Sequence, residues 1–162
     1  MGQLTTTSSI SIMTQVCFIG TSETGVQYEL LSRETARDAL STYDISEPFT
    51  NSLAVETVSL GTAITLCNDL NWYLTRFVAL SLIQESSVSD TEWLSRSLAE
   101  AVRNGEVEPE ESGKYLAVYG IEENRPVEPL YVIRGADETI PRYDLRDVSE
   151  TLIVRLSADE FK

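Results

Sequence analysis

The strongest secondary-structure pattern in the chain lies in residues 53–83, which read LAVETVSLGTAITLCNDLNWYLTRFVALSLI. Residues 53–60 are rich in β-branched side chains arranged in two alternating sets, which predicts a strand. The next residues predict the clearest amphipathic helix, because its apolar side chains recur at steps of three and four: Ala63, Leu66, Cys67, Leu70, Tyr73, Leu74 and Phe77. Residues 77–83 predict a second strand, and the right-handed crossover rule makes the two strands parallel if they are neighbours.

Another strand is predicted upstream of this unit. Residues 16–20 are apolar and predict a buried strand. Residues 26–30 alternate and predict a half-buried strand, after which Ser32 can cap a helix that extends to Tyr43. A single longer helix that starts at Gly25 is the alternative.

A capping box marks the next predicted helix. Ser89 and Glu92 are spaced so that each side chain can bond a backbone N–H at the start of a helix. Val88 and Trp93 can pack together as a hydrophobic staple. Gly105 then ends the helix in the left-handed conformation.

The last third of the chain predicts one short helix and two strands. Pro109 can open a helix in which Leu116 and Tyr119 face the core and which Gly120 ends. Residues 127–134 and 151–156 predict strands joined by a polar loop.

These elements predict an α+β domain, with a mixed sheet of about five or six strands and three or four packed helices. An α/β arrangement of βαβ units is the alternative. Residues 1–12 are uncharged and rich in Ser and Thr. We expect them to form a disordered extension, with the true start at Met13 and one globular domain over residues 13–162.

The chain is strongly acidic, with 26 Asp and Glu residues against 12 basic ones and a net charge of −14. Ten of the basic residues are Arg, and only Lys114 and Lys162 are Lys. Arg is more weakly hydrated than Lys, and molar salt screens the repulsion between surface carboxylates. The composition therefore predicts a halophilic protein, and its acidity disfavours binding to nucleic acid and to anionic membranes.

The composition also excludes several classes of chemistry. The chain has no His, which rules out Ser-His-Asp and Cys-His catalysis within it. Cys17 and Cys67 lack a metal-binding spacing, so we expect buried thiols, no zinc and no cofactor. No run approaches the roughly 20 apolar residues of a membrane span, and a signal peptide is not evident. We therefore expect a cytoplasmic protein.

One candidate binding site lies on the polar side of the amphipathic helix. Asn68 and Trp72 are i,i+4 neighbours, as are Trp72 and Arg76, so Arg76 can stack on the indole ring. With Asp69 they offer a ring, an amide and a carboxylate, which could bind a small ligand or a peptide. A partly covered helix face without a ligand is the alternative.

Four arginines could gather beside the last two strands as an anion-binding or partner-binding patch: Arg134, Arg142, Arg146 and Arg155. The alternative, which we favour, is internal ion pairing. The expected partners are Glu128, Asp144, Asp147 and Glu150, because Arg is the usual cation in such pairs.

Six short stretches read MTQVC (13–17), ETA (34–36), NSLAVET (51–57), NDLNWYL (68–74), EWLSR (92–96) and YDLR (143–146). Together they resemble a family of small uncharacterised proteins from haloarchaea. The resemblance spans residues 13–162 and agrees with a halophilic protein that starts at Met13. It implies no activity and no site residue.

Three functional hypotheses follow. The leading one is a non-enzymatic interaction or regulatory domain with a protein partner. The second is a small-ligand-binding protein or a carboxylate-using enzyme with a pocket near Asp69 and Arg76. The third is a nucleic-acid-associated protein that binds through its C-terminal arginines.

Overall fold

The computed structural model describes residues 14–23, 25–134 and 150–161. The expected extension at residues 1–12 and the start at Met13 lie outside these residues. The strands are β1 (Thr14–Gly20), β2 (Ser52–Thr57), β3 (Val78–Glu85), β4 (Trp93–Ser95), β5 (Tyr115–Glu122), β6 (Arg125–Ile133) and β7 (Glu150–Leu156). The helices are α2 (Val26–Leu31), α3 (Glu34–Leu40), α4 (Leu60–Asp69), α5 (Asn71–Phe77) and α6 (Arg96–Arg103), with a 3-10 turn η1 (Pro109–Glu111).

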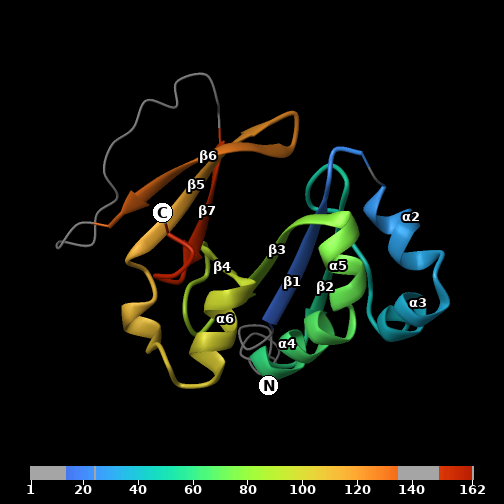
Figure 1. Ribbon diagram of the computed structural model, residues 1–162, viewed down its shortest axis with the longest axis horizontal. Coiled ribbons are helices and arrows are strands. Elements are labelled where there is room, and N and C mark those ends of the chain that lie inside the picture. The colour runs from blue at the N-terminus through green and yellow to red at the C-terminus, as the bar shows by residue number, and fades with distance from the viewer. Residues whose placement is uncertain (1–13, 24, 135–149, 162) are drawn as a thin grey trace, which may run out of the picture.

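The strands of the described residues form one mixed sheet in the order β2-β1-β3-β4-β7-β5-β6, which confirms the predicted α+β single domain. The sheet has seven strands, more than the five or six expected. β1 pairs antiparallel with both β2 and β3. β2 and β3 therefore run in the same direction, but they are not neighbours, because β1 lies between them. In Figure 1 the helices gather around β1, β2 and β3, whereas β5, β6 and β7 extend away from them as a wing.

Both faces of β1 are buried, which explains its unbroken apolar sequence. Val16 and Phe18 belong to a core that the helices complete with Leu30, Leu66 and Leu98, among others. Each strand presents alternate residues to opposite faces. The other face of the same strands therefore needs a separate cover.

The wing covers this other face of β1 and β3, because the sheet curls so that β5 and β7 pack against it. Cys17 of β1 and Leu82 of β3 pack in one cluster with Ala117 of β5 and Val154 of β7. Twisted sheets of many strands curl in this way. The wing thereby gives the sheet a concave face.

The bend is fixed by contacts at the tip of the β5–β6 hairpin. Glu123 and Asn124 have φ angles of 53° and 63°, and two residues with positive φ are the mark of a type I′ turn, which suits a tight hairpin. The backbone N–H of Thr50 donates to the carbonyl of Asn124 over 2.8 Å, and the Asn124 amide donates to the Pro48 carbonyl over 3.2 Å. The hairpin tip thus meets the loop before β2.

The predicted strand over residues 26–30 is wrong, because these residues form helix α2. The side chain of Asn51, which is remote in sequence, accepts a hydrogen bond from the backbone N–H of Val26 over 2.8 Å. The Val26 N–H is one of the donors at the start of α2 that have no partner within the helix, and Gly25 at the cap position has no side chain to accept from it. The alternative of one longer helix is also wrong, since the chain breaks before α3, and Ser32 provides no side-chain cap there.

The prediction of a capping box at Ser89 is confirmed only in its first hydrogen bond. The Ser89 hydroxyl accepts from the backbone N–H of Glu92 over 3.0 Å, as a cap would. The chain then continues into β4, and helix α6 begins later, with Ser95 accepting from the Leu98 N–H over 3.1 Å. The staple is wrong, because Trp93 packs on the face of the sheet opposite to Val88.

The helix expected from Pro109 to Gly120 is also wrong. Only η1 forms there, and β5 follows it in the middle of the wing, between β7 and β6. Its side chains alternate between faces, with Leu116 and Val118 on one and Ala117 on the other. The long helix predicted before β3 is present but divided, as α4 and α5.

Other predictions hold. The strands over residues 16–20, 53–60, 77–83, 127–134 and 151–156 correspond to β1, β2, β3, β6 and β7. Gly105 has a φ of +79°, which confirms the left-handed helix end. Both cysteines are buried and free. None of the described helices is long and apolar enough to cross a membrane.

Candidate functional site

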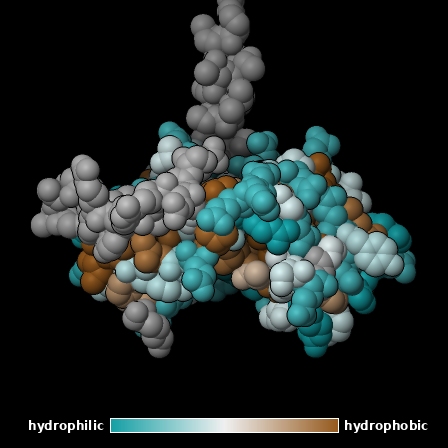
Figure 2. Space-filling model, turned by 90° about the horizontal axis from the view of Figure 1, so that it is seen from above, coloured by the Kyte–Doolittle hydropathy of each residue, from teal (hydrophilic) through white to brown (hydrophobic). Residues whose placement is uncertain are grey.

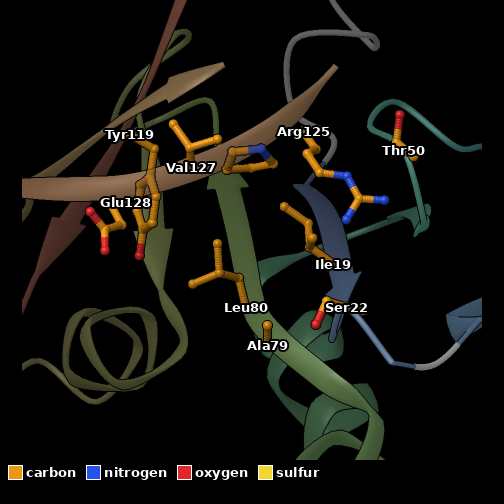
Figure 3. Close-up of a pocket in the computed structure, with 11 residues that line it drawn as sticks. Ile19, Ser22, Thr50, Ala79, Leu80, Tyr119, Arg125, Val127 and Glu128 are labelled. Carbon is orange, nitrogen blue, oxygen red and sulfur yellow. The ribbon is translucent and has the colours of Figure 1, made fainter. Parts of the chain in front are cut away.

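Two adjoining hollows, of about 340 and 330 Å³, open on the concave face beside the first half of β3. Ala79, Leu80 and Tyr119 line both of them. Figure 3 shows the first hollow, in which Leu80 and Ala79 of β3 lie opposite Tyr119 and Val127 of the wing. We call the two hollows together the β3 groove. Its ends are marked by Gly20, Thr50 and Arg125 on one side and by Ser95, Arg96 and Glu160 on the other.

The floor of the groove is a strand edge without a neighbour. β4 pairs with β3 only through Leu82 and Ile83, because the chain turns into α6 directly after Ser95. On that side residues 78–81 therefore have no strand partner within the described ranges. The register of β3 with β1 also shifts here, so that Ala79 is an extra, bulged residue. Bulges are frequent beside functional sites.

Aromatic side chains form the wall of the groove on the wing. Tyr119 and Tyr131 line it, and Tyr131 is 52% exposed. The Phe161 ring, in the turn after β7, lies 6.4 Å from the ring of Tyr131. Burial, assisted by the neighbouring Tyr131 and Glu160, raises the pKa of Tyr119 to about 12. Its hydroxyl is therefore a neutral donor and acceptor at physiological pH.

β6 has further exposed apolar side chains on both of its faces: Ile133 lies on the same face as Tyr131, and Leu130 lies on the other. Leu130 and Ile133 are 37% and 48% exposed, high values for large apolar side chains. Figure 2 shows hydrophobic residues gathered on the side of the molecule where the wing lies, and hydrophilic ones around α2 and α3. Tyr131 lines the groove, and exposed aromatic and apolar side chains are typical of interaction sites.

Each hollow of the groove is lined by one arginine and one glutamate: Arg125 and Glu128 in the first, Arg96 and Glu160 in the second. Arg96 donates to Asn71 and Asn68 over 2.8 and 3.0 Å. At the end near Gly20, Arg125 is exposed and makes no hydrogen bond or ion pair with another described residue; its guanidinium points toward Ile19 and Thr50 (Figure 3). At the other end, Glu160 accepts hydrogen bonds from Ser95 and Ser157, the former over 2.6 Å. All of these bonds end on Oε1. No described residue donates a hydrogen bond to Oε2, so this oxygen can accept one from a ligand.

Of the four predicted C-terminal arginines, Arg134 and Arg155 come together, and Arg142 and Arg146 lie outside the described residues. Both contact Glu92: the Arg155 Nε donates to its Oε1 over 2.7 Å, and an Arg134 NH2 group reaches both oxygens at 2.8 and 2.7 Å. Arg155 also donates to the hydroxyl of Ser112 over 2.9 Å. These two arginines are thus internally paired, with a partner that sequence reasoning had assigned to a helix cap.

This cluster is largely buried, with side-chain exposures of 16%, 13% and 12% for Arg134, Glu92 and Arg155. Burial would raise the pKa of Glu92, but the hydrogen bonds and charges of Arg155 and Arg134 outweigh it and hold the pKa below its ordinary value. The Nε of Arg134 is buried without a partner in the described part of the chain. We assign the cluster a structural role, since it joins β4, β6 and β7.

The predicted helix-face site lies elsewhere on the surface. Arg76 stacks on Trp72, with its guanidinium carbon 3.8 Å from the ring centroid, as the spacing predicted. Trp72 is 51% exposed, and Asp69 and Arg76 are exposed as well. Asn68 instead accepts from Arg96 of α6 over 3.0 Å. None of these residues lines the β3 groove.

Sequence reasoning missed the groove because its walls come from segments distant in the chain. Tyr119 had been placed on a helix, and Leu80 gave only a strand signal. One sequence clue was available: residues 115–121 are a short apolar run with aromatic and β-branched side chains, and the polar residues 122–124 follow it, which is the pattern of a buried strand before a turn.

Residues 14–121 match the model of a family of unknown function, DUF5804. The match covers most of the chain, so the protein belongs to this family. The comparison with curated proteins and the comparison with solved structures each found no match.

Proposed function

We propose that the protein is a non-enzymatic interaction module of a halophilic cytoplasm and that it binds a protein partner in the β3 groove. The observation that carries the proposal is the free edge of β3 in an open, aromatic-lined hollow. Main-chain N–H and C=O groups on a strand edge require hydrogen-bond partners.

Within the described residues, prolines and a bridge interrupt parts of the other two strand edges of the sheet, and neither feature is found along the free half of β3. β6 carries Pro126 and Pro129 in its first half, and prolines within sheets are typical of edge strands. β2 is partly covered by a bridge between Ser46 and Ala54. Residues 78–81 have neither a proline nor a covering strand among the described residues. An open strand edge that lies within a hollow favours use as a binding surface.

The composition supports a salt-rich environment. Molar salt screens exposed ion pairs, whereas apolar burial and main-chain hydrogen bonds do not depend on net charge. A groove of aromatic side chains beside a strand edge therefore suits a partner bound in concentrated salt. We expect the free energy of unfolding to rise between about 0.1 M and molar KCl as the repulsion of the −14 net charge is screened. Stability that does not depend on KCl would contradict this part of the proposal.

The two described arginines of the C-terminal set argue against the nucleic-acid alternative. Arg134 and Arg155 direct donors to Glu92 and Ser112. Donors held in this way are not available to phosphate groups. We therefore consider a protein partner better supported than a nucleic acid.

The test is affinity purification of the tagged protein from its native lysate in molar KCl, with partners identified by mass spectrometry. Three baits are compared: the wild type, Tyr131→Ala and Trp72→Ala. Tyr131 and Trp72 are matched, because they are 52% and 51% exposed on different surfaces. We expect a stoichiometric protein partner that Trp72→Ala retains and Tyr131→Ala loses. A partner lost only by Trp72→Ala would move the site to the helix face, and recovery of the bait alone would contradict the proposed function.

A further inference from the structure

We infer that the ligand of the β3 groove is the extended N-terminal segment of a partner protein, which adds to residues 78–81 as a strand antiparallel to β3. This inference rests on the proposed function and names the chemistry of the partner. β4 ends before it reaches the first half of β3. Ser95 pairs with Leu82, and the next position along that line, opposite Ser81, holds no strand because α6 begins at Arg96.

The hollow beside the free edge has the shape that a strand requires. Its floor is Ala79, Leu80, Ser81 and Leu82, which are consecutive in β3. Four residues of strand extend about 14 Å at a rise of roughly 3.4 Å per residue. An extended peptide of about four residues therefore fills the free edge, with its main chain bonded to β3 as in other cases of strand addition.

The groove is closed at one end, which identifies the part of the partner that enters it. Ser95 and Arg96 stand at this end, where the chain leaves β4 for α6. A polypeptide that adds here cannot continue past them in the same line, so a strand that begins or ends at this point fits the groove without a bend in its main chain. An added strand antiparallel to β3 runs in the direction of β4, which places its amino terminus at the closed end.

The charges favour this orientation. Glu160 is at the closed end, and its Oε2 can accept from an amino terminus. The reverse orientation would set a terminal carboxylate against the Glu160 carboxylate, while the Arg96 NH1 and NH2 groups at the same end already donate to Asn71 and Asn68. At the open end, Arg125 has no other described partner and can pair with an acidic side chain of the ligand. Charge-assisted hydrogen bonds of this kind are the stronger class.

The walls determine the expected sequence pattern. Successive side chains of a strand point to opposite faces. Alternate residues of the added strand therefore face the concave side, toward Tyr119 and Tyr131. We expect apolar residues at these alternate positions and an acidic residue near the fourth or fifth position.

The experiment selects ligands from a phage-displayed library of random heptapeptides with free amino termini, against the folded full-length protein in molar KCl. The best peptide is then synthesised with a free and with an acetylated amino terminus. We expect Tyr131→Ala and acetylation each to weaken binding by about tenfold. Trp72→Ala should leave the affinity unchanged. Arg125→Gln should weaken the binding of peptides with an acidic fourth or fifth residue, and by less in molar KCl than at about 0.3 M, because salt screens this exposed pair. The exposed Arg37→Gln serves as its control.

Hydrogen exchange read by mass spectrometry separates strand addition from other modes of binding. Bound peptide should slow the exchange of amides in residues 78–81. Peptides N-methylated at odd or at even positions should differ, because only alternate amides of an added strand bond to β3.

The failures of the two proposals are distinguishable. A selected peptide that leaves exchange in residues 78–81 unchanged, or that binds equally well after acetylation, would overturn the inference. The proposed function would still stand if the affinity purification yields a partner that depends on Tyr131. A library that yields no binder overturns the inference as well, and recovery of the bait alone from the lysate overturns the function.

Discussion

Replacement of Glu92 by Gln should destabilise the protein far more than replacement of any exposed carboxylate. The Glu92 side chain is 13% exposed and accepts from Arg155 and Arg134 at distances of 2.7 and 2.8 Å. Gln has the same shape, but it brings an NH2 group against these donors and leaves two buried guanidinium groups without a counter-charge. Loss of one partner from a buried ion pair costs about 3–5 kcal/mol, and we expect about 3 kcal/mol because the cluster keeps some exposure.

Urea unfolding in constant molar KCl, followed by circular dichroism, measures this loss. With a slope of about 2 kcal/mol per molar urea, the midpoint should fall by about 1.5 M. Glu29→Gln is the matched control. Glu29 also pairs with an arginine, Arg33, over 2.9 Å, but with side-chain exposures of 22% and 42%. Exposed pairs contribute about 0–1 kcal/mol, so this variant should stay close to the wild type. Equal losses in the two variants would refute the argument that burial makes the Glu92 cluster important.

Three further outcomes follow from the same structure. The pKa of Glu92 is lower in the folded state than the unfolded value of about 4.3, so its contribution is present above that pH. Unfolding experiments should show stability falling as the pH drops through this region, and a flatter profile for Glu92→Gln. Ser95→Ala removes the cap of α6 and a donor to Glu160, and should cost about 1–2 kcal/mol in urea unfolding. Burial raises the pKa of Cys17 to about 12 and of Cys67 to about 11. A thiol reagent at neutral pH should label both only after unfolding, and rapid labelling of the native protein would contradict their burial.

The fold could be predicted where the local pattern and the tertiary environment agree. β1 was predicted because both of its faces are buried, which requires an unbroken apolar run. The helix of residues 62–77 was predicted because one apolar stripe faces the core, although it divides at Leu70. The stacking of Arg76 on Trp72 followed from i,i+4 spacing alone.

Other elements could not be predicted, because remote contacts override local signals. Ser89 makes its capping hydrogen bond, but Trp93 is drawn into the sheet between β3 and β7. Residues 26–30 form a helix whose first N–H is satisfied by Asn51. Such contacts carry no local signature, so a short segment with two plausible conformations cannot be assigned from its own residues.

The sequence by itself determined the α+β class, the strongly acidic composition and the absence of His, because these depend only on residue types and on short periodic patterns. The tertiary structure alone decided where binding can occur. The β3 groove exists because β4 ends after pairing with Leu82 and because the wing curls over the same face of the sheet. The partner of Arg134 and Arg155 was decided in the same way, since chain folding brings Glu92 from 42 and 63 residues away. Both features arise from contacts between strands that are distant in the sequence. The energy of strand pairing depends on which segments meet, and the local sequence does not encode that choice.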